Sequence, residues 1–151
     1  MLRSQAFLSA ICFAIAVAAP ANAACVNLQE PNSVSFEGTL TRRIFAGPPN
    51  YEDVRKGDAR EPAYILKLDE AICAVGDEFV DAGTKFDLIQ IFPDGAGAAG
   101  QGLARELRRL VGQRVSVGGK SAFGAHTGHH HAPLVMPITR IAVAPARRSH
   151  R

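Results

Sequence analysis

The order of strand-like and helix-like segments is the feature that most constrains the fold of this chain. Residues 34–45 alternate apolar with polar side chains, the pattern of a half-buried strand, and Gly38 in the middle would let that strand bend. Further strand patterns cover residues 63–68, 86–92, 114–123 and 134–143. We therefore predict five strands.

One amphipathic helix interrupts this series. Its apolar positions are Leu103, Leu107, Leu110 and Val111, and Gly112 ends it. Three strands, a helix and two strands follow one another in an OB-fold. We predict a mainly β protein with a five-stranded OB-fold-like barrel and one helix between strands 3 and 4. An unrelated small barrel or an α+β sandwich is the alternative.

The first residues indicate export. Arg3 precedes an apolar run over residues 6–19, and the triplet Ala21-Asn22-Ala23 offers small side chains for cleavage. We predict a signal peptide over residues 1–23 and a periplasmic or secreted protein after cleavage near Ala23. The run is shorter than the roughly 20 residues that span a bilayer, and no transmembrane segment is predicted. A lipoprotein anchored through Cys25 is the alternative.

The rest of the chain is expected to form one OB-like domain over residues 24–145, followed by a basic disordered tail over residues 146–151. The charge is nearly balanced, with 17 basic and 14 acidic residues. There is no Trp and there are only two Tyr, whereas nucleic-acid-binding surfaces combine a basic stripe with aromatic side chains. We expect no nucleic-acid partner.

The cysteines predict one disulfide. Cleavage of the leader would remove Cys12 and leave Cys25 and Cys73 as the only pair in an oxidising compartment. Two buried thiols are the alternative.

Four of the five histidines lie in one short segment, His126-Thr127-Gly128-His129-His130-His131. Neutral imidazole is the commonest transition-metal ligand, so we predict zinc or copper ligands at His126, His129 and His131. His130 and His131 are adjacent, and side chains of neighbouring extended residues point to opposite sides. The alternatives are a solvated polar turn, a structural hydrogen bond and a pH-sensitive contact surface.

The connection between the first two strands is long and rich in proline. Its candidate ligand-binding residues are Asn50, Tyr51, Asp53 and Asp58. In the alternative interpretation, Asp58 caps a turn and Tyr51 packs over the barrel mouth. OB-folds bind ligands with this loop and with the loop between strands 4 and 5, which here carries the histidines. We therefore expect the two loops to form one site.

Several segments resemble the bacterial domain-of-unknown-function family numbered 4431. They are Gly47-Pro48-Pro49-Asn50-Tyr51-Glu52, Gly57-Asp58, Tyr64-Ile65-Leu66-Lys67-Leu68-Asp69 with Ile72-Cys73, and Thr127-Gly128-His129-His130-His131-Ala132-Pro133. The resemblance extends over roughly residues 38–141. It implies a small protein of a kind that is often exported, in which the two loops matter together, and it supplies no reaction.

These observations predict an exported binding module for a metal ion or a small polar ligand. The alternative is a cell-envelope protein-interaction module, an inhibitor or accessory subunit, that uses the same loops as its contact surface. No serine lies in a nucleophile-elbow context, so an enzymatic role is not favoured. A hydrolase would require a loop-bound metal with an open coordination position.

Overall fold

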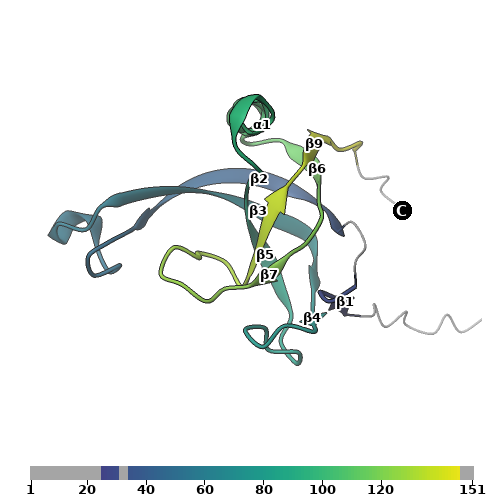
Figure 1. Cartoon of the computed structure of the whole chain (residues 1–151), viewed down its shortest axis with the longest axis horizontal. Helices are drawn as coiled ribbons and strands as arrows, with labels where there is room; N and C mark the ends of the chain where they lie inside the picture. Colours follow the sequence, from purple (N-terminus) through teal and green to yellow (C-terminus); the bar gives the residue numbers. More distant parts are fainter. Residues whose placement is uncertain (1–24, 31–33, 147–151) are drawn as a thin grey trace, which may run out of the picture.

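The computed structural model describes residues 25–30 and 34–146, and the fold there is mainly β (Figure 1). The strands are β1 (Val26–Asn27), β2 (Val34–Ala46), β3 (Arg60–Ile72), β4 (Ala74–Val75), β5 (Phe86–Pro93), β6 (Arg114–Gly119), β7 (Phe123–Gly124), β8 (Leu134–Ile138) and β9 (Arg140–Val143). The 3-10 helix η1 (Val54–Lys56) follows β2, and the helix α1 (Gly97–Leu110) lies between β5 and β6. The predicted leader lies outside the described residues, as does the predicted tail beyond residue 146.

All five predicted strand segments are strands, and the mainly β class with a single helix after the third is confirmed for the described residues. The last two segments are divided. Residues 114–123 contain β6 and the start of β7, and residues 134–143 form β8 and β9 on either side of Thr139.

The predicted five-stranded OB-fold-like barrel is not confirmed. The main sheet has seven strands in the order β7-β8-β5-β3-β2-β6-β9, which is not a closed barrel, and β1 and β4 form a separate two-stranded sheet. β2 pairs with β6 over its first half and with β3 over its second, and it changes partners around Gly38 and Thr39. Gly38 permits this change, because a Cβ there would lie 2.2 Å from the Lys67 carbonyl oxygen.

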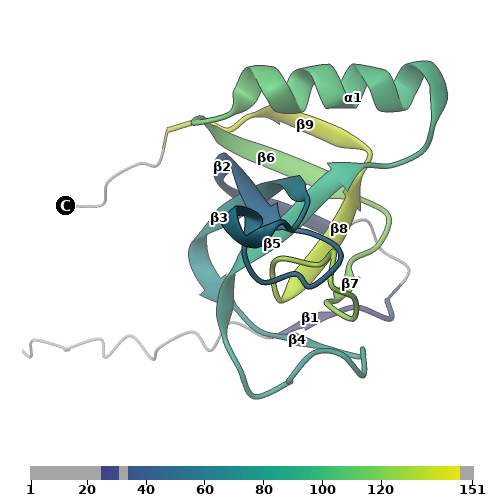
Figure 2. The same cartoon turned by 90° about the vertical axis from the view of Figure 1, so that its left-hand side faces the viewer.

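Helix α1 starts earlier than the apolar pattern predicts. It includes the Gly/Ala-rich segment from Gly97, where the missing side chain of Gly100 allows the Gly95 carbonyl to approach the helix. Leu107 and Leu110 are fully buried. Val111 was expected on the buried stripe, but it follows the helix and is 41% exposed. Figure 2 shows α1 lying across one end of the sheet, above β9 and β6.

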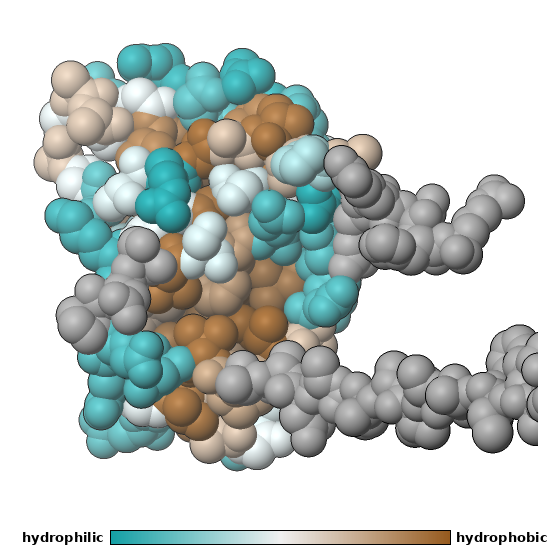
Figure 3. Space-filling view, turned by 90° about the vertical axis from the view of Figure 1, so that its right-hand side faces the viewer, coloured by the Kyte–Doolittle hydropathy of each residue, from teal (hydrophilic) through white to brown (hydrophobic). Residues whose placement is uncertain are grey.

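Two apolar clusters lie on opposite sides of the β3 backbone. Leu40, Leu66 and Ile89 belong to the large core beneath the sheet. The small outer cluster consists of Ala63, Ile65 and Ala132, with Phe45 and Leu88 packed against it. Ala132 comes from the segment between β7 and β8, so this cluster anchors that segment to the outside of the sheet. Figure 3 views the molecule from the side opposite to that of Figure 2, and there apolar surface lies between polar regions.

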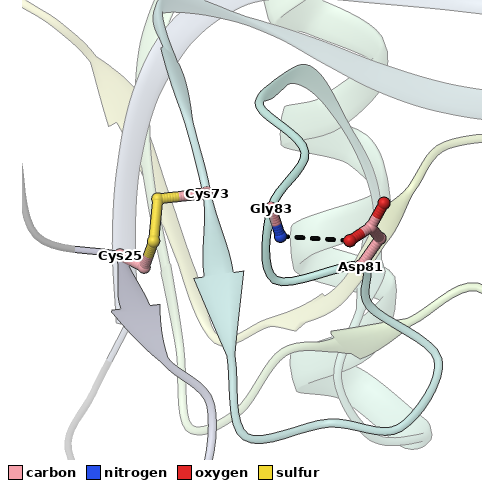
Figure 4. Close-up of a disulfide and its surroundings, with 4 residues drawn as sticks. All are labelled: Cys25, Cys73, Asp81 and Gly83. Carbon is pink, nitrogen blue, oxygen red and sulfur yellow. Dashed lines mark hydrogen bonds between the residues drawn. A yellow bond between two sulfur atoms is a disulfide. The ribbon is translucent and has the colours of Figure 1, made fainter.

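The predicted disulfide between Cys25 and Cys73 is present (Figure 4). It lies beside the parallel pairing of β1 with β4, in which Val26 is opposite Ala74. In the hairpin that follows, Asp81 accepts a hydrogen bond from the Gly83 amide. In the described part of the chain, no helix is long and apolar enough to cross a membrane.

Candidate functional site

The two loops singled out from the sequence lie side by side. The proline loop, residues 47–59, connects β2 to β3, and the histidine turn, residues 126–131, lies between β7 and β8. Both extend from the same side of the sheet in Figures 1 and 2. They touch where Gly128 lies under the Tyr51 ring, since a Cβ at Gly128 would be 2.9 Å from Tyr51 Cε1.

Asp58 organises the proline loop. Its carboxylate is buried and accepts hydrogen bonds from the backbone amides of Asn50, Glu52 and Asp53 and from the Asn50 side chain, at 2.8–3.1 Å. The amide hydrogen bonds from Glu52, Asp53 and Asn50 lower the pKa of Asp58 and outweigh its desolvation. Asp58 is therefore an ionised structural centre of the loop.

Asp53 and Asn50 also form contacts within the proline loop. Asp53 caps η1 by accepting the Arg55 amide at 2.8 Å and pairs with the Arg55 guanidinium. Asn50 uses both its backbone and side-chain N–H groups on Asp58. Of the four candidate ligand-binding residues, Tyr51 is the one whose side chain the structure joins to the histidine turn.

Tyr51 adopts a left-handed backbone conformation, with φ at 61°. This conformation is unfavourable for a bulky side chain, and such residues concentrate at functional positions. The ring is 39% exposed and meets the His129 ring edge-on, with centroids 5.3 Å apart. The Tyr51 hydroxyl lies 3.1 Å from His129 Nε2. The proline loop thus places the partly exposed Tyr51 phenol against the histidine turn.

Glu61, at the start of β3, brings two histidines of the turn together. Its carboxylate oxygens lie 3.0 and 2.9 Å from His129 Nδ1, and one of them is 3.3 Å from His131 Nε2. A carboxylate can only accept, so His129 Nδ1 donates and Nε2 of the neutral ring accepts from Tyr51. Tyr51, His129 and Glu61 form one hydrogen-bonded series across the two loops.

His131 is held tightly. Its side chain is 8% exposed and stacks on Phe45 with ring centroids 4.1 Å apart and an interplanar angle of 5°. Gln90 on β5 fixes the backbone on both sides: its Oε1 accepts from the His131 amide, and its Nε2 donates to the His129 carbonyl. His131 Nε2 is buried; within the described residues it has no partner in good hydrogen-bond geometry, and Glu61 Oε1 lies 3.3 Å away.

His126 and His130 form a separate group on the other side of the turn. The His126 amide donates to His130 Nδ1 at 3.0 Å, and His126 Nδ1 lies 2.8 Å from the Gly124 carbonyl oxygen. Both rings lie against Phe123, and His126 also contacts Phe79. Burial, followed by the charges of the neighbouring histidines, lowers the pKa of His130. The structure therefore separates His126 from His129 and His131.

Glu61, Gln90 and Phe45 were not predicted as site residues. Glu61 and Phe45 are opposite one another in the β2–β3 ladder, so the alternation of the two strands places them on one face. That face was the available signal, but the position of the turn over it was not visible in the sequence. Within residues 25–30 and 34–146, no group of three or more His, Cys, Asp and Glu residues is arranged to hold a metal ion.

Comparison with known families gives one match. Residues 88–142 match the model of a domain of unknown function, DUF4431, which confirms the resemblance over the part of the chain from β5 to β9. This part contains the histidine turn but not the proline loop. No curated protein and no solved structure matches the chain.

Proposed function

We propose that this chain, which carries the DUF4431 match over residues 88–142, is an exported binding module. Its site for a metal ion or small polar ligand lies where the proline loop meets the histidine turn. The observation that carries the proposal is the hydrogen-bonded series from Tyr51 through His129 to Glu61. It links two loops that are 78 residues apart in sequence and leaves the phenol and imidazole half-exposed.

Unfavourable local conformations where the proline loop meets the histidine turn support a binding role. The left-handed Tyr51 is unfavourable in a stable fold, and so is the buried His131 Nε2, which within the described residues lacks a partner in good hydrogen-bond geometry. The junction lies at the surface, where neither feature is needed to complete the main core. Such local strain is typical of residues that a ligand contacts.

The arrangement also fits an OB-like barrel, which we propose as the underlying architecture. β2 pairs with both β3 and β6, β5 and β8 are parallel, and α1 lies between β5 and β6. β8 and β9 lie towards opposite ends of the sheet order, although Thr139 alone separates them in sequence. In an OB-fold, the proline loop and the histidine turn would be the two loops that bind ligands.

Export is supported by the composition of residues 1–23 and by the disulfide. A Cys25–Cys73 bond is stable in an oxidising compartment such as the periplasm, whereas cytosolic thiols are kept reduced. We therefore place the proposed site in the cell envelope or outside the cell. At that location, the metal concentration and the pH at the site would be those of the surrounding medium.

Zinc and copper titration of the untagged mature protein tests this function. We expect one ion per chain, bound at least ten times more tightly than by an unstructured peptide containing residues 126–131. The expectation follows because the fold holds the imidazoles in place before binding. A purification tag rich in histidine would duplicate the feature under test and has to be absent.

If the protein binds both metals no more tightly than the peptide does, the proposal that the site holds a metal ion is contradicted. The exposed Tyr51 and histidine turn would then be tested as a contact surface for an envelope protein. In that case, Tyr51→Ala should remove a co-purifying partner while the circular dichroism spectrum is unchanged.

A further inference from the structure

We propose that the free end of the β2–β3 ribbon binds the surface of an anionic lipid bilayer. This end consists of residues 42–46 of β2, residues 60–64 of β3 and the proline loop between them, and we call it the ribbon end. The contact is peripheral, and the partner is the layer of phosphate headgroups. This inference goes beyond the proposed ligand site and does not depend on it.

The ribbon end projects from the rest of the sheet. β2 pairs with β6 as far as Thr39, and β3 pairs with β5 from Tyr64 onwards. Within the described residues, 43–46 and 60–63 therefore pair with each other alone. Figure 1 shows this part of the ribbon extending to the left, away from α1, β6 and β9. Such a projection can reach a flat surface before the rest of the molecule does.

One face of the ribbon end carries cations around an apolar centre. The β2–β3 register is continuous here, so side chains alternate, and Arg42 and Ile44 follow Leu40 of the core on the same face. On β3, Pro62 is opposite Ile44, and Arg60 lies two residues further towards the loop. Ile44 is 41% exposed, and both arginines and the proline are exposed. An apolar side chain flanked by guanidinium groups fits the boundary between headgroups and acyl chains.

The positive charge of the ribbon end is not neutralised by the protein. Within residues 25–30 and 34–146, four exposed basic side chains of this end form no ion pair: Arg42, Arg43, Lys56 and Arg60. Most acidic groups nearby are engaged, since Asp53 pairs with Arg55, Asp58 is buried among loop N–H groups, and Glu61 contacts two histidines. Glu52 is the remaining exposed carboxylate of the proline loop. The ribbon end can therefore attract an anionic partner.

The placement of these cations favours a flat bilayer over a folded protein. Arg42 and Arg60 lie on the face described above, Arg43 lies on the opposite face, and Lys56 lies in η1 within the loop. A protein docked on one face of the ribbon would leave the other cations outside the contact. A bilayer that meets the ribbon end can bring its headgroups to cations on both faces and in the loop.

The expected strength suits a reversible contact. Each lysine or arginine close to an anionic bilayer raises the binding constant by about fivefold. Four of them give a factor of roughly six hundred. Burial of the exposed part of Ile44 adds about another fivefold. The electrostatic part should weaken with salt, because exposed charges are screened.

Co-sedimentation of the untagged mature protein with unilamellar vesicles, in the presence of a metal chelator, tests the inference. We expect binding to vesicles of phosphatidylcholine and phosphatidylglycerol in equal parts, and none to vesicles of phosphatidylcholine alone. Raising the sodium chloride concentration from about 0.05 to about 0.5 M should release the wild type from the mixed vesicles. This release needs no variant, so no folding defect can affect it.

Two pairs of substitutions locate the contact. Arg42→Gln combined with Arg60→Gln should weaken binding to the mixed vesicles by about 25-fold. The matched control is Arg105→Gln combined with Arg108→Gln, which removes the same charge from exposed positions of α1 and should leave binding within about twofold. Ile44→Ser should weaken binding by about fivefold at constant charge. Circular dichroism checks that each variant keeps the fold.

Equal binding to both kinds of vesicle would overturn the inference, and so would absence of binding to either. An equal loss in the α1 control would also overturn it, because the charge of the whole molecule would then be responsible rather than the ribbon end. Binding to soluble polyglutamate without binding to the mixed vesicles would overturn it as well and would identify an acidic protein as the class of partner. Because the chelator removes metal, none of these results depends on the proposed ligand site.

Discussion

At the scale of single residues, polar residues of the proline loop that were candidates for ligand binding instead form hydrogen bonds that stabilise their own loop. Asp58 was a candidate ligand residue, but four N–H groups of its own loop occupy its oxygens. Glu61 resembles a solvated charge at the start of a strand, and its importance depends on histidines about 70 residues away. Sequence spacing identifies residue types that can bind, whereas the partner of each depends on tertiary structure.

Asp58→Asn should lower the midpoint of thermal unfolding at pH 7, because an amide nitrogen cannot accept the Glu52 and Asp53 amides. The folded-state pKa of Asp58 is below its ordinary value of 3.8. Its contribution is therefore fully present above that value and is lost as the pH falls through the folded-state pKa. The difference between wild type and variant should shrink below about pH 4. Melting curves from pH 7 to pH 2 measure it, and a constant difference would contradict this role.

At the scale of secondary structure, periodicity predicted the long strands and the α-helix that the structure describes in residues 34–146. The alternation in 34–45 and the stripe through Leu107 and Leu110 were sufficient, because each element buries one face. The boundaries were less accurate. The start of α1 lies in a Gly/Ala-rich segment without periodicity, and it depends on the close approach of Gly95 to Gly100.

Gly38→Ala should destabilise the protein by about 1–3 kcal/mol, because the new methyl group would overlap the Lys67 backbone where β2 changes partners. Denaturant unfolding measures the change. Gly83→Ala is the matched control, since the nearest atom to a Cβ there is 3.6 Å away. Equal stability of the two variants would show that β2 and β3 separate without cost.

At the scale of the whole molecule, the mainly β class was predictable from the sequence, and the five-stranded OB-fold-like barrel was an extrapolation from strand order. The sequence could not show how the histidine turn folds back. That position depends on Ala132 packing against Ala63 and Ile65 and on Gln90 holding the turn. The site is consequently a property of the assembled sheet.

The Cys25–Cys73 bond links the β1 segment to the end of β3 across 48 residues. Replacing both cysteines with serine should lower the free energy of unfolding by about 4 kcal/mol on the chain-entropy account. Guanidinium unfolding of the variant and of reduced wild type should give similar losses. A loss below about 1 kcal/mol in both would show that the unfolded chain is not restricted by this bond.

The division of residues 134–143 at Thr139 has a consequence for how the protein is made. β8 pairs with the edge of β5, and β9 pairs with the edge of β6. Both edges are therefore unpaired until residues 134–143 are in place. A polypeptide synthesised from its N-terminus cannot complete either edge until residues 134–143 have been made. Open edges promote association between chains. Truncation before residue 134 should therefore yield aggregates rather than a smaller folded protein.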